Sequence, residues 1–114
     1  MHDVHALTRA DIDVTDHART CSVLKDLRPE AVLNTTAYHR VDDCETHPEL
    51  AYAVNVLAVL NLIRIANELD AVLVHISTDY VFDGKQPEPY TEKSIPFPLS
   101  VYANSKFAGE TLVR

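Results

Sequence analysis

Glycine is scarce in this sequence: Gly84 and Gly109 are the only two among 114 residues, whereas glycine makes up about 7% of an average protein. A glycine-rich turn that seats phosphate groups at a helix N-terminus needs several glycines close together. The sequence therefore contains no turn of this kind.

Cysteine and long apolar runs are also sparse. The two cysteines, Cys21 and Cys44, are too few for a disulfide framework or a CxxC metal site, and they predict reduced thiols that pack in the interior. No apolar run approaches the roughly 18 residues that a membrane span requires, so we expect no membrane span. The opening MHDVHALTRAD lacks the pattern of a signal peptide, so we expect a cytoplasmic protein.

Basic side chains are outnumbered, with 10 Lys and Arg against 17 Asp and Glu and a net charge of -7. A general phosphate-backbone binder needs a basic face, so we expect no nucleic-acid partner. The six histidines form no HExxH or i, i+4 pair, so we predict no metal site. With 46% hydrophobic and 24% charged residues, residues 1–114 have the composition of one soluble globular domain.

Apolar periodicity predicts strands that alternate with helices. Strands are expected at residues 4–7, 12–14, 31–34 and 71–76, the last of them covered on both faces. One helix is expected from an N-cap at Thr15 or Asp16 to the Arg28-Pro29 stop, a second of about 20 residues from Pro48, and a third from Ser100 or Tyr102 onward. Residues 79–99 are expected to form a loop. This alternation indicates parallel strands joined by crossovers, hence an α/β fold with a Rossmann-like doubly wound sheet.

Tyr102 and Lys106 carry the most specific chemical signal of the last helix. Residues four apart share a helix face, so the phenol and the ammonium lie side by side. The positive charge favours the phenolate, which lets Tyr102 exchange a proton with a substrate oxygen. A surface Tyr and Lys on one helix face is the structural alternative.

Compact polar groups follow three of the predicted strands. They occur in Ser77–Gly84, in Asn34–Asp42 and at Asp13-Val14. The carboxyl ends of parallel strands share one rim, where doubly wound folds bind ligands. Ordinary polar turns would use the same residue types, but their convergence on one rim favours a shared crevice.

Five segments together resemble the dTDP-4-dehydrorhamnose reductases, which are extended short-chain dehydrogenase/reductases. The segments are Asp11-Ile-Asp-Val-Thr-Asp16, Asn34-Thr-Thr-Ala-Tyr38 with Val41-Asp42, Ala51-Tyr-Ala-Val-Asn55, His75-Ile-Ser-Thr-Asp-Tyr-Val-Phe-Asp-Gly84 and Val101-Tyr-Ala-Asn-Ser-Lys-Phe-Ala-Gly-Glu110. They cover nearly the whole chain in order and spacing.

This resemblance implies reduction of the 4-keto group of a nucleotide-linked deoxysugar, with NADPH or NADH as the cofactor. It assigns Tyr102 as the proton donor, Lys106 as its activator and ribose contact, Thr78 as the hydroxyl at the reacting oxygen, and Asp79 as a sugar contact. The implied cofactor-binding residues are Asp13, Val14, Thr36, Ala37, Tyr38, Asn55 and Lys106. For Asn55, a polar residue that closes a packed helix is an alternative interpretation. The family also implies a possible homodimer of the full-length protein.

The chain departs from the family pattern in two places. Asn34-Thr-Thr-Ala-Tyr-His39 replaces the usual Asn-Ala-Ala-Ala-Tyr-Thr, and the family's first strand and glycine-rich loop have no counterpart. We therefore expect an internal fragment: a partial NAD(P)-binding Rossmann domain over residues 1–114, without the first strand and the C-terminal substrate domain.

Two other functions remain open. One is a non-catalytic regulatory subunit similar to the methionine adenosyltransferase beta subunit, although the presence of Thr78, Tyr102 and Lys106 favours an enzyme. The other is a nucleotide-sugar epimerase or dehydratase, which commonly has Asp-Glu where this chain has Asp79-Tyr80.

Overall fold

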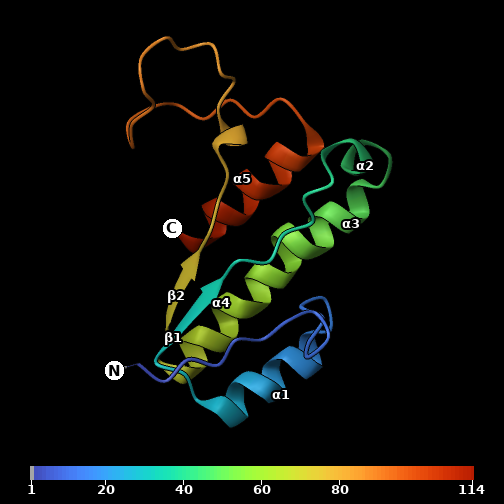
Figure 1. The fold of residues 1–114 in the computed structure, drawn as a ribbon, viewed down its shortest axis with the longest axis vertical. Coiled ribbons are helices and arrows are strands. Elements are labelled where there is room, and N and C mark those ends of the chain that lie inside the picture. The colour runs from blue at the N-terminus through green and yellow to red at the C-terminus, as the bar shows by residue number, and fades with distance from the viewer. Residues whose placement is uncertain (1) are drawn as a thin grey trace.

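The structure is a computed structural model that describes residues 2–114. Its elements follow the order α1 (His17–Leu27), β1 (Ala31–Asn34), α2 (Val41–Thr46), α3 (Pro48–Tyr52), η1 (Ala53–Leu57), α4 (Ala58–Leu69), β2 (Val72–His75), η2 (Asp79–Val81) and α5 (Val101–Val113). The two strands lie side by side, with α4 next to them, α1 below α4 and α5 near the far end of β2 (Figure 1). They are parallel, with Ala31 opposite Val72 and Asn34 opposite His75. This arrangement confirms the α/β class and the predicted strands at 31–34 and 71–76.

The core lies on one face of this small sheet. Leu24 of α1 and Leu62 and Ile65 of α4 form a buried cluster, against which Val32 and Leu73 of the two strands pack. Strand residues alternate between faces, so Leu33, Val72 and Val74 point the other way and are 64%, 63% and 45% exposed. The expectation that β2 is covered on both faces was therefore wrong, because the helices among residues 2–114 cover one face only.

Helix α1 is fixed at its start by a side-chain cap. The carboxylate of Asp16 accepts a hydrogen bond from the Arg19 amide at 2.9 Å, which satisfies one of the amides left free in a first helical turn. At the other end, Arg28 adopts a left-handed conformation with φ 48° and closes the helix. Of the two predicted N-caps, Asp16 is the one the structure uses.

We expect Asp16→Ala to lower the free energy of unfolding by about 0.5–2 kcal/mol, because the capping acceptor is lost. Urea denaturation measures this change. Asp26→Ala is the matched control, since Asp26 lies in the last turn of the same helix, where a negative charge is unfavourable. An equal loss in both variants would contradict the capping role.

The predicted helix from Pro48 to Leu69 is confirmed as one continuous run of α3, η1 and α4. Its middle segment, Ala53–Leu57, is a π-helical turn; such turns often occur at functional sites. By length and composition the run could also cross a membrane, with a mean hydropathy of 1.5 over its most apolar stretch and 39% of that stretch buried. The expectation that no apolar stretch approaches this length was therefore wrong. The buried side chains of α4 include Val59, Leu62 and Ile65.

The strands predicted at residues 4–7 and 12–14 are wrong. The structure has no strand between residues 2 and 30, and all residues from 2 to 11 are exposed. A strand exists only where a neighbouring strand supplies hydrogen bonds, and β1 pairs with β2 alone in the described part of the chain. Local turns hold this segment instead, such as the bond from the Asp11 amide to the Thr8 carbonyl at 3.0 Å.

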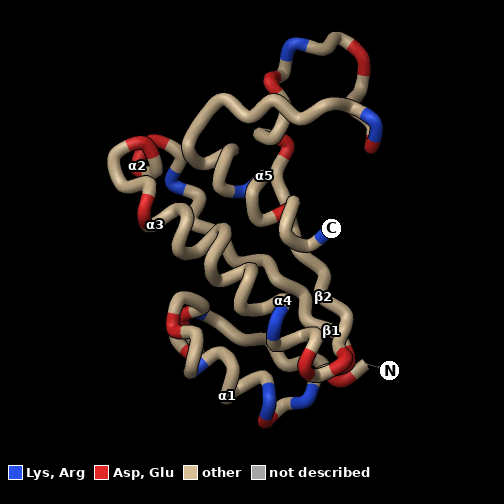
Figure 2. The backbone as a smooth tube through the Cα atoms, turned by 180° about the vertical axis from the view of Figure 1, so that it is seen from behind, with Lys and Arg blue, Asp and Glu red and all other residues tan. Residues whose placement is uncertain are grey.

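Helix α2 was not among the helices predicted from the sequence. Acidic positions gather at this helix (Figure 2). Asp42 and Asp43 stand in its first turn, where they suit the helix dipole, and Cys44 anchors it with 0% exposure. The two cysteines are free thiols. The predicted loop at 79–99 is confirmed apart from η2, and it folds back through a bond from the Phe97 amide to the Val81 carbonyl at 2.8 Å.

Candidate functional site

Helix α5 presents Tyr102 in its first turn and Lys106 one turn later. The helix begins after Ser100, whose hydroxyl accepts a bond from the Ala103 amide at 3.1 Å. Tyr102 is half-buried, and its ring meets the ring of Tyr80 edge to face, with centroids 5.7 Å apart. The start of α5 therefore places the phenol beside the turn that follows β2.

Lys106 is the most deeply buried charged group of this region, with 2% exposure. Its ammonium donates to the carbonyl of Ile76 at 2.6 Å, just beyond the end of β2. Burial lowers the pKa of Lys106, and the charge of Glu110 opposes this shift. An ammonium has three donors, so within residues 2–114 two of them have no protein partner. Such free donors suit ribose hydroxyls.

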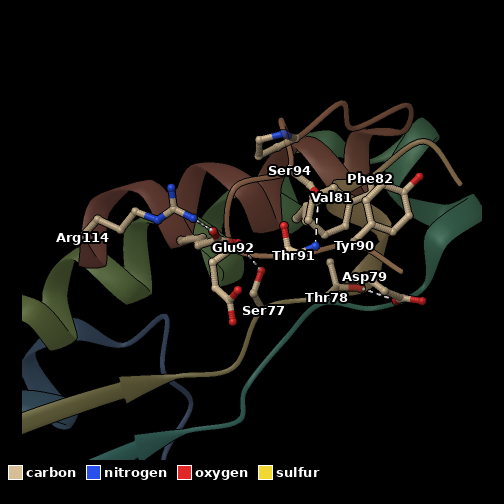
Figure 3. A pocket seen from close by; sticks show the side chains of 12 residues that line it. Ser77, Thr78, Asp79, Val81, Phe82, Tyr90, Thr91, Glu92, Ser94 and Arg114 are labelled. Atoms are coloured by element: carbon tan, nitrogen blue, oxygen red, sulfur yellow. Dashed lines mark hydrogen bonds and ion pairs between the residues drawn. The ribbon is translucent and has the colours of Figure 1, made fainter. Parts of the chain in front are cut away.

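The turn after β2 carries Ser77, Thr78 and Asp79. The Thr78 hydroxyl accepts from the Tyr80 amide and donates to the Asp79 carboxylate, both at 3.3 Å. These residues border an open hollow of about 530 Å³, shown in Figure 3. Its lining consists of Ser77, Thr78, Asp79, Val81, Phe82, Tyr90, Thr91, Glu92, Ser94, Pro96, Glu110 and Arg114. Tyr102 and Lys106 are outside this lining.

Asn55 joins the long helix to both the β1 loop and α5. It is fully buried; its Oδ1 accepts from the Tyr38 amide at 2.9 Å, and its Nδ2 donates to the Tyr38 carbonyl at 3.1 Å and to the Ser105 hydroxyl at 2.9 Å. Ser105 in turn donates to the Tyr102 carbonyl at 2.8 Å. Both amide hydrogens of Asn55 are thus used within the protein. The side chain holds Tyr38 and Ser105 in place relative to the long helix.

The segment after β1 holds the next three predicted cofactor residues. The carboxamide oxygen of Asn34 accepts from the amide and the hydroxyl of Thr36 at 3.0 and 2.7 Å, and Ala37 is half-buried beside it. The Tyr38 hydroxyl donates to Asp43, and this bond raises the pKa of Tyr38. Asn34 and Asn55 therefore fix this segment from its two ends.

Asp13 and Val14 lie apart from these groups in the hydrogen-bond network. The Asp13 carboxylate accepts from the amide and hydroxyl of Thr15 at 2.9 and 2.7 Å, and these bonds lower its pKa. In the described chain, no hydrogen bond connects these two residues to the segment after β1 or to α5. Among the described residues, hydrogen bonds therefore link Asn55 with Tyr38 and, through Ser105, with the Tyr102 carbonyl. They do not join Thr78, Asp13 or Val14 to this group.

Sequence reasoning missed the pair formed by Asn34 and His75 on adjacent strands. The Asn34 oxygen is already used by Thr36, so its Nδ2 donates to His75 Nδ1 at 3.0 Å. The ring proton then sits on Nε2, which is buried without a hydrogen-bond partner in the described residues. Burial, followed by the charge of Lys106, lowers the pKa of His75, against a smaller opposite effect of Glu110.

We expect the lowered pKa of His75 to make the fold acid-sensitive. The folded protein keeps the ring neutral, whereas the unfolded chain takes up a proton below the ordinary pKa of 6.5. Stability is therefore complete above pH 6.5 and falls as the pH drops toward the folded-state pKa. Urea midpoints measured across this range should fall as the pH falls. This dependence on pH should be weaker in His75→Gln than in the parent protein and unchanged in the exposed control His2→Gln. An unchanged slope in His75→Gln would refute this assignment.

The donor set fits part of a dinucleotide cofactor. The Lys106 ammonium, with one acceptor in the described residues, offers donors for the ribose side, but Gly84 and Gly109 are the only glycines. Gly84 follows η2 and Gly109 lies inside α5, so neither forms a pyrophosphate-binding turn before a helix. The residues present suit the nicotinamide half of such a cofactor and include no glycine-rich turn for its phosphates.

A parallel strand pair backed by helices, with a Tyr and Lys pair at the strand ends, defines a Rossmann-type α/β protein. Residues 1–114 match the family model described as the RmlD substrate binding domain. The chain belongs to this family. The resemblance inferred from its sequence motifs is thereby confirmed.

Relatives of two kinds are similar to the chain. A dTDP-4-dehydrorhamnose reductase of Aggregatibacter actinomycetemcomitans is 38% identical over 98% of this chain and 38% of its own length. The methionine adenosyltransferase 2 subunit beta of Xenopus laevis is 40% identical over 90% of this chain and 30% of its own length. The chain therefore spans about a third of the length of these curated relatives.

The fold is similar to that of a solved reductase. The crystal structure of dTDP-4-dehydrorhamnose reductase from Bacillus anthracis in complex with NADP superimposes with a TM-score of 0.93 at 36% identity, covering 98% of this chain and 40% of that one. This similarity confirms the Rossmann-type fold, of which the chain forms a part.

Proposed function

We propose that this chain carries the proton-transfer residues of an NAD(P)H-dependent reductase that acts on the 4-keto group of a nucleotide-linked deoxysugar. The observation that carries this proposal is the placement of Lys106. Lys106 lies one helical turn after Tyr102, and its buried ammonium donates to the Ile76 carbonyl at 2.6 Å. Ile76 precedes Thr78 by two residues, so this bond holds the start of the turn that carries Thr78. The similarity to the NADP complex of the Bacillus anthracis reductase supports the same function.

When bound, the reduced nicotinamide supplies a hydride to the substrate carbonyl carbon. Tyr102 donates its hydroxyl proton to the carbonyl oxygen as negative charge develops there. The ammonium of Lys106 stabilises the phenolate that remains. The Thr78 hydroxyl turns from Asp79 to donate a hydrogen bond to the same oxygen, and Asp79, which is exposed at the hollow, contacts the sugar.

Cofactor binding is assigned to the residues around the strand ends. Lys106 has two free donors for the nicotinamide ribose, and Thr36, Ala37 and Tyr38 run along the cofactor. Asp13 and Val14 lie beside the adenine in this proposal, and Asn55 acts by holding Tyr38 and Ser105. Residues 1–114 then form a partial NAD(P)-binding domain for NADPH or NADH. We further propose a cytoplasmic enzyme and a homodimer of the full-length protein.

A hybrid enzyme tests this function. The segment of the Aggregatibacter actinomycetemcomitans reductase that aligns with this chain is replaced by the chain itself, so that the relative supplies the rest of its own fold. We expect the hybrid to oxidise NADPH when dTDP-4-dehydrorhamnose is added, and Thr78→Val to slow this reaction. A folded hybrid that binds NADPH without oxidising it in the presence of the sugar would refute the proposal.

A regulatory subunit is the second candidate, because the Xenopus laevis subunit beta is 40% identical to the chain. This function requires binding to another protein rather than turnover. Size-exclusion chromatography of the chain with the catalytic methionine adenosyltransferase 2 subunit distinguishes the two. Co-elution together with an inactive hybrid would favour the regulatory function.

A further inference from the structure

We propose that Glu110 is a positioning residue: through Ser77 it holds residues 76–78, which follow β2, against helix α5. This inference rests on the proposed function and deepens it, because residue 78 is the threonine assigned to the reacting oxygen. Glu110 also borders the hollow lined by Thr78 and Asp79, but the proposal gives it no contact with the reacting atoms.

Two parallel connections join the turn after β2 to α5. Ile76 accepts from the Lys106 ammonium at 2.6 Å, and the Ser77 hydroxyl donates to Glu110 Oε2 at 2.8 Å. Lys106 and Glu110 are four residues apart and share one helix face. Two consecutive residues after β2 are thus bonded to residues one helical turn apart on α5. Thr78 is the next residue in the chain.

The carboxylate of Glu110 is itself held in place. Its side chain is 21% exposed, and its other oxygen, Oε1, pairs with Arg114 one turn further along. Figure 3 shows Ser77 after the strand and Arg114 at the C-terminal end of α5, with dashed lines marking the two interactions. With both oxygens bonded, Glu110 presents a fixed acceptor to Ser77.

Glu110 also balances the charge of Lys106. Its negative charge raises the pKa of that lysine against the effect of burial. The same residue therefore supports the position of the turn through Ser77 and the charged state of Lys106 through space. Exchanging Glu110 for glutamine separates these effects, since glutamine keeps an acceptor oxygen but has no charge.

The first test measures position in the full 114-residue chain. The rings of Tyr80 and Tyr102, 5.7 Å apart, report how the turn after β2 lies on α5, and NMR cross-relaxation between them measures this contact. We expect the signal to weaken in Glu110→Ala and in the milder Ser77→Ala, and to persist in Glu110→Gln. An unchanged signal in both alanine variants would overturn the proposal.

The second test measures turnover in the hybrid reductase. Because a hydrogen bond to a charged acceptor is lost, we expect kcat to fall about tenfold in Glu110→Ala and Ser77→Ala, with the KM for NADPH unchanged. The double variant should be no slower than Glu110→Ala, since the Ser77 hydroxyl has no acceptor left once Glu110 is gone. Additive losses, or a raised KM with unchanged kcat, would overturn the proposal.

Two controls complete the design. Glu49→Gln removes an exposed acid on α3 and should leave kcat unchanged, whereas Glu110→Gln should recover most of the activity lost in Glu110→Ala. An unmodified hybrid without turnover would refute the proposed function alone. The ring contact between Tyr80 and Tyr102 would still decide the role of Glu110.

Discussion

Replacing Tyr102 with phenylalanine is expected to lower the kcat of the hybrid reductase by about 10²- to 10⁴-fold, the usual contribution of a positioned general acid. The ring and its edge-to-face contact with Tyr80 are retained, so only the transferable proton is lost. Steady-state oxidation of NADPH with the 4-keto sugar measures the change. The KM for NADPH should stay the same, because the phenylalanine ring fills the same space.

Tyr52→Phe is the matched control for this prediction. Tyr52 lies on α3 and is 40% exposed, and it also loses one phenolic hydroxyl. We expect its kcat to be unchanged. If Tyr102→Phe retained full turnover, Tyr102 would not be the proton donor, and the regulatory function would become the better explanation of the chain.

Gly109→Ala is expected to lower the free energy of unfolding by about 3 kcal/mol, at the upper end of the usual cost of overpacking. A Cβ at this position would lie well inside van der Waals contact of the Asn55 carbonyl oxygen and 3.5 Å from His75 Nε2. Backbone atoms cannot turn aside, so α5 and the π-helical turn must separate. Urea denaturation measures this loss.

Gly84→Ala provides the comparison for this effect. Gly84 has φ +72° and nothing within 4 Å of an added Cβ, so its substitution costs only the strain of a left-handed alanine, about 1 kcal/mol. Alanine normally stabilises a helix relative to glycine. A Gly109→Ala variant as stable as the parent would therefore show that α5 does not approach the long helix this closely.

The predicted helix boundaries that proved correct are those with local signals. The cap at Asp16, the stop at Arg28-Pro29 and Pro48 at a helix start act within a few residues, so they can be recognised without the rest of the fold. The strands expected at 4–7 and 12–14 depended instead on hydrogen bonds to a neighbour that residues 2–114 do not provide. A strand covered on both faces likewise depends on other elements.

In the candidate site, too, local pairs could be predicted from the sequence and contacts between distant residues could not. Tyr102 and Lys106 could be paired from their spacing on one helix. The partners that hold them come from distant parts of the chain: Ile76 lies 30 residues from Lys106, and Ser77 lies 33 residues from Glu110. Asn34 and His75, 41 residues apart, meet only because β1 and β2 pair in register. No periodicity in the sequence specifies these contacts.

The π-helical turn at Ala53–Leu57 changes which direction the residues after it face, compared with a regular α-helix. A π turn holds one residue more than an α turn, as if a single residue had been inserted. Removing one residue here would restore a regular helix and rotate everything beyond it by about 100° relative to α3. Asn55 could then no longer face Tyr38 and Ser105 while α4 kept Leu62 and Ile65 in the core. The extra residue lets one helix serve two surfaces that a regular helical repeat would bring out of phase.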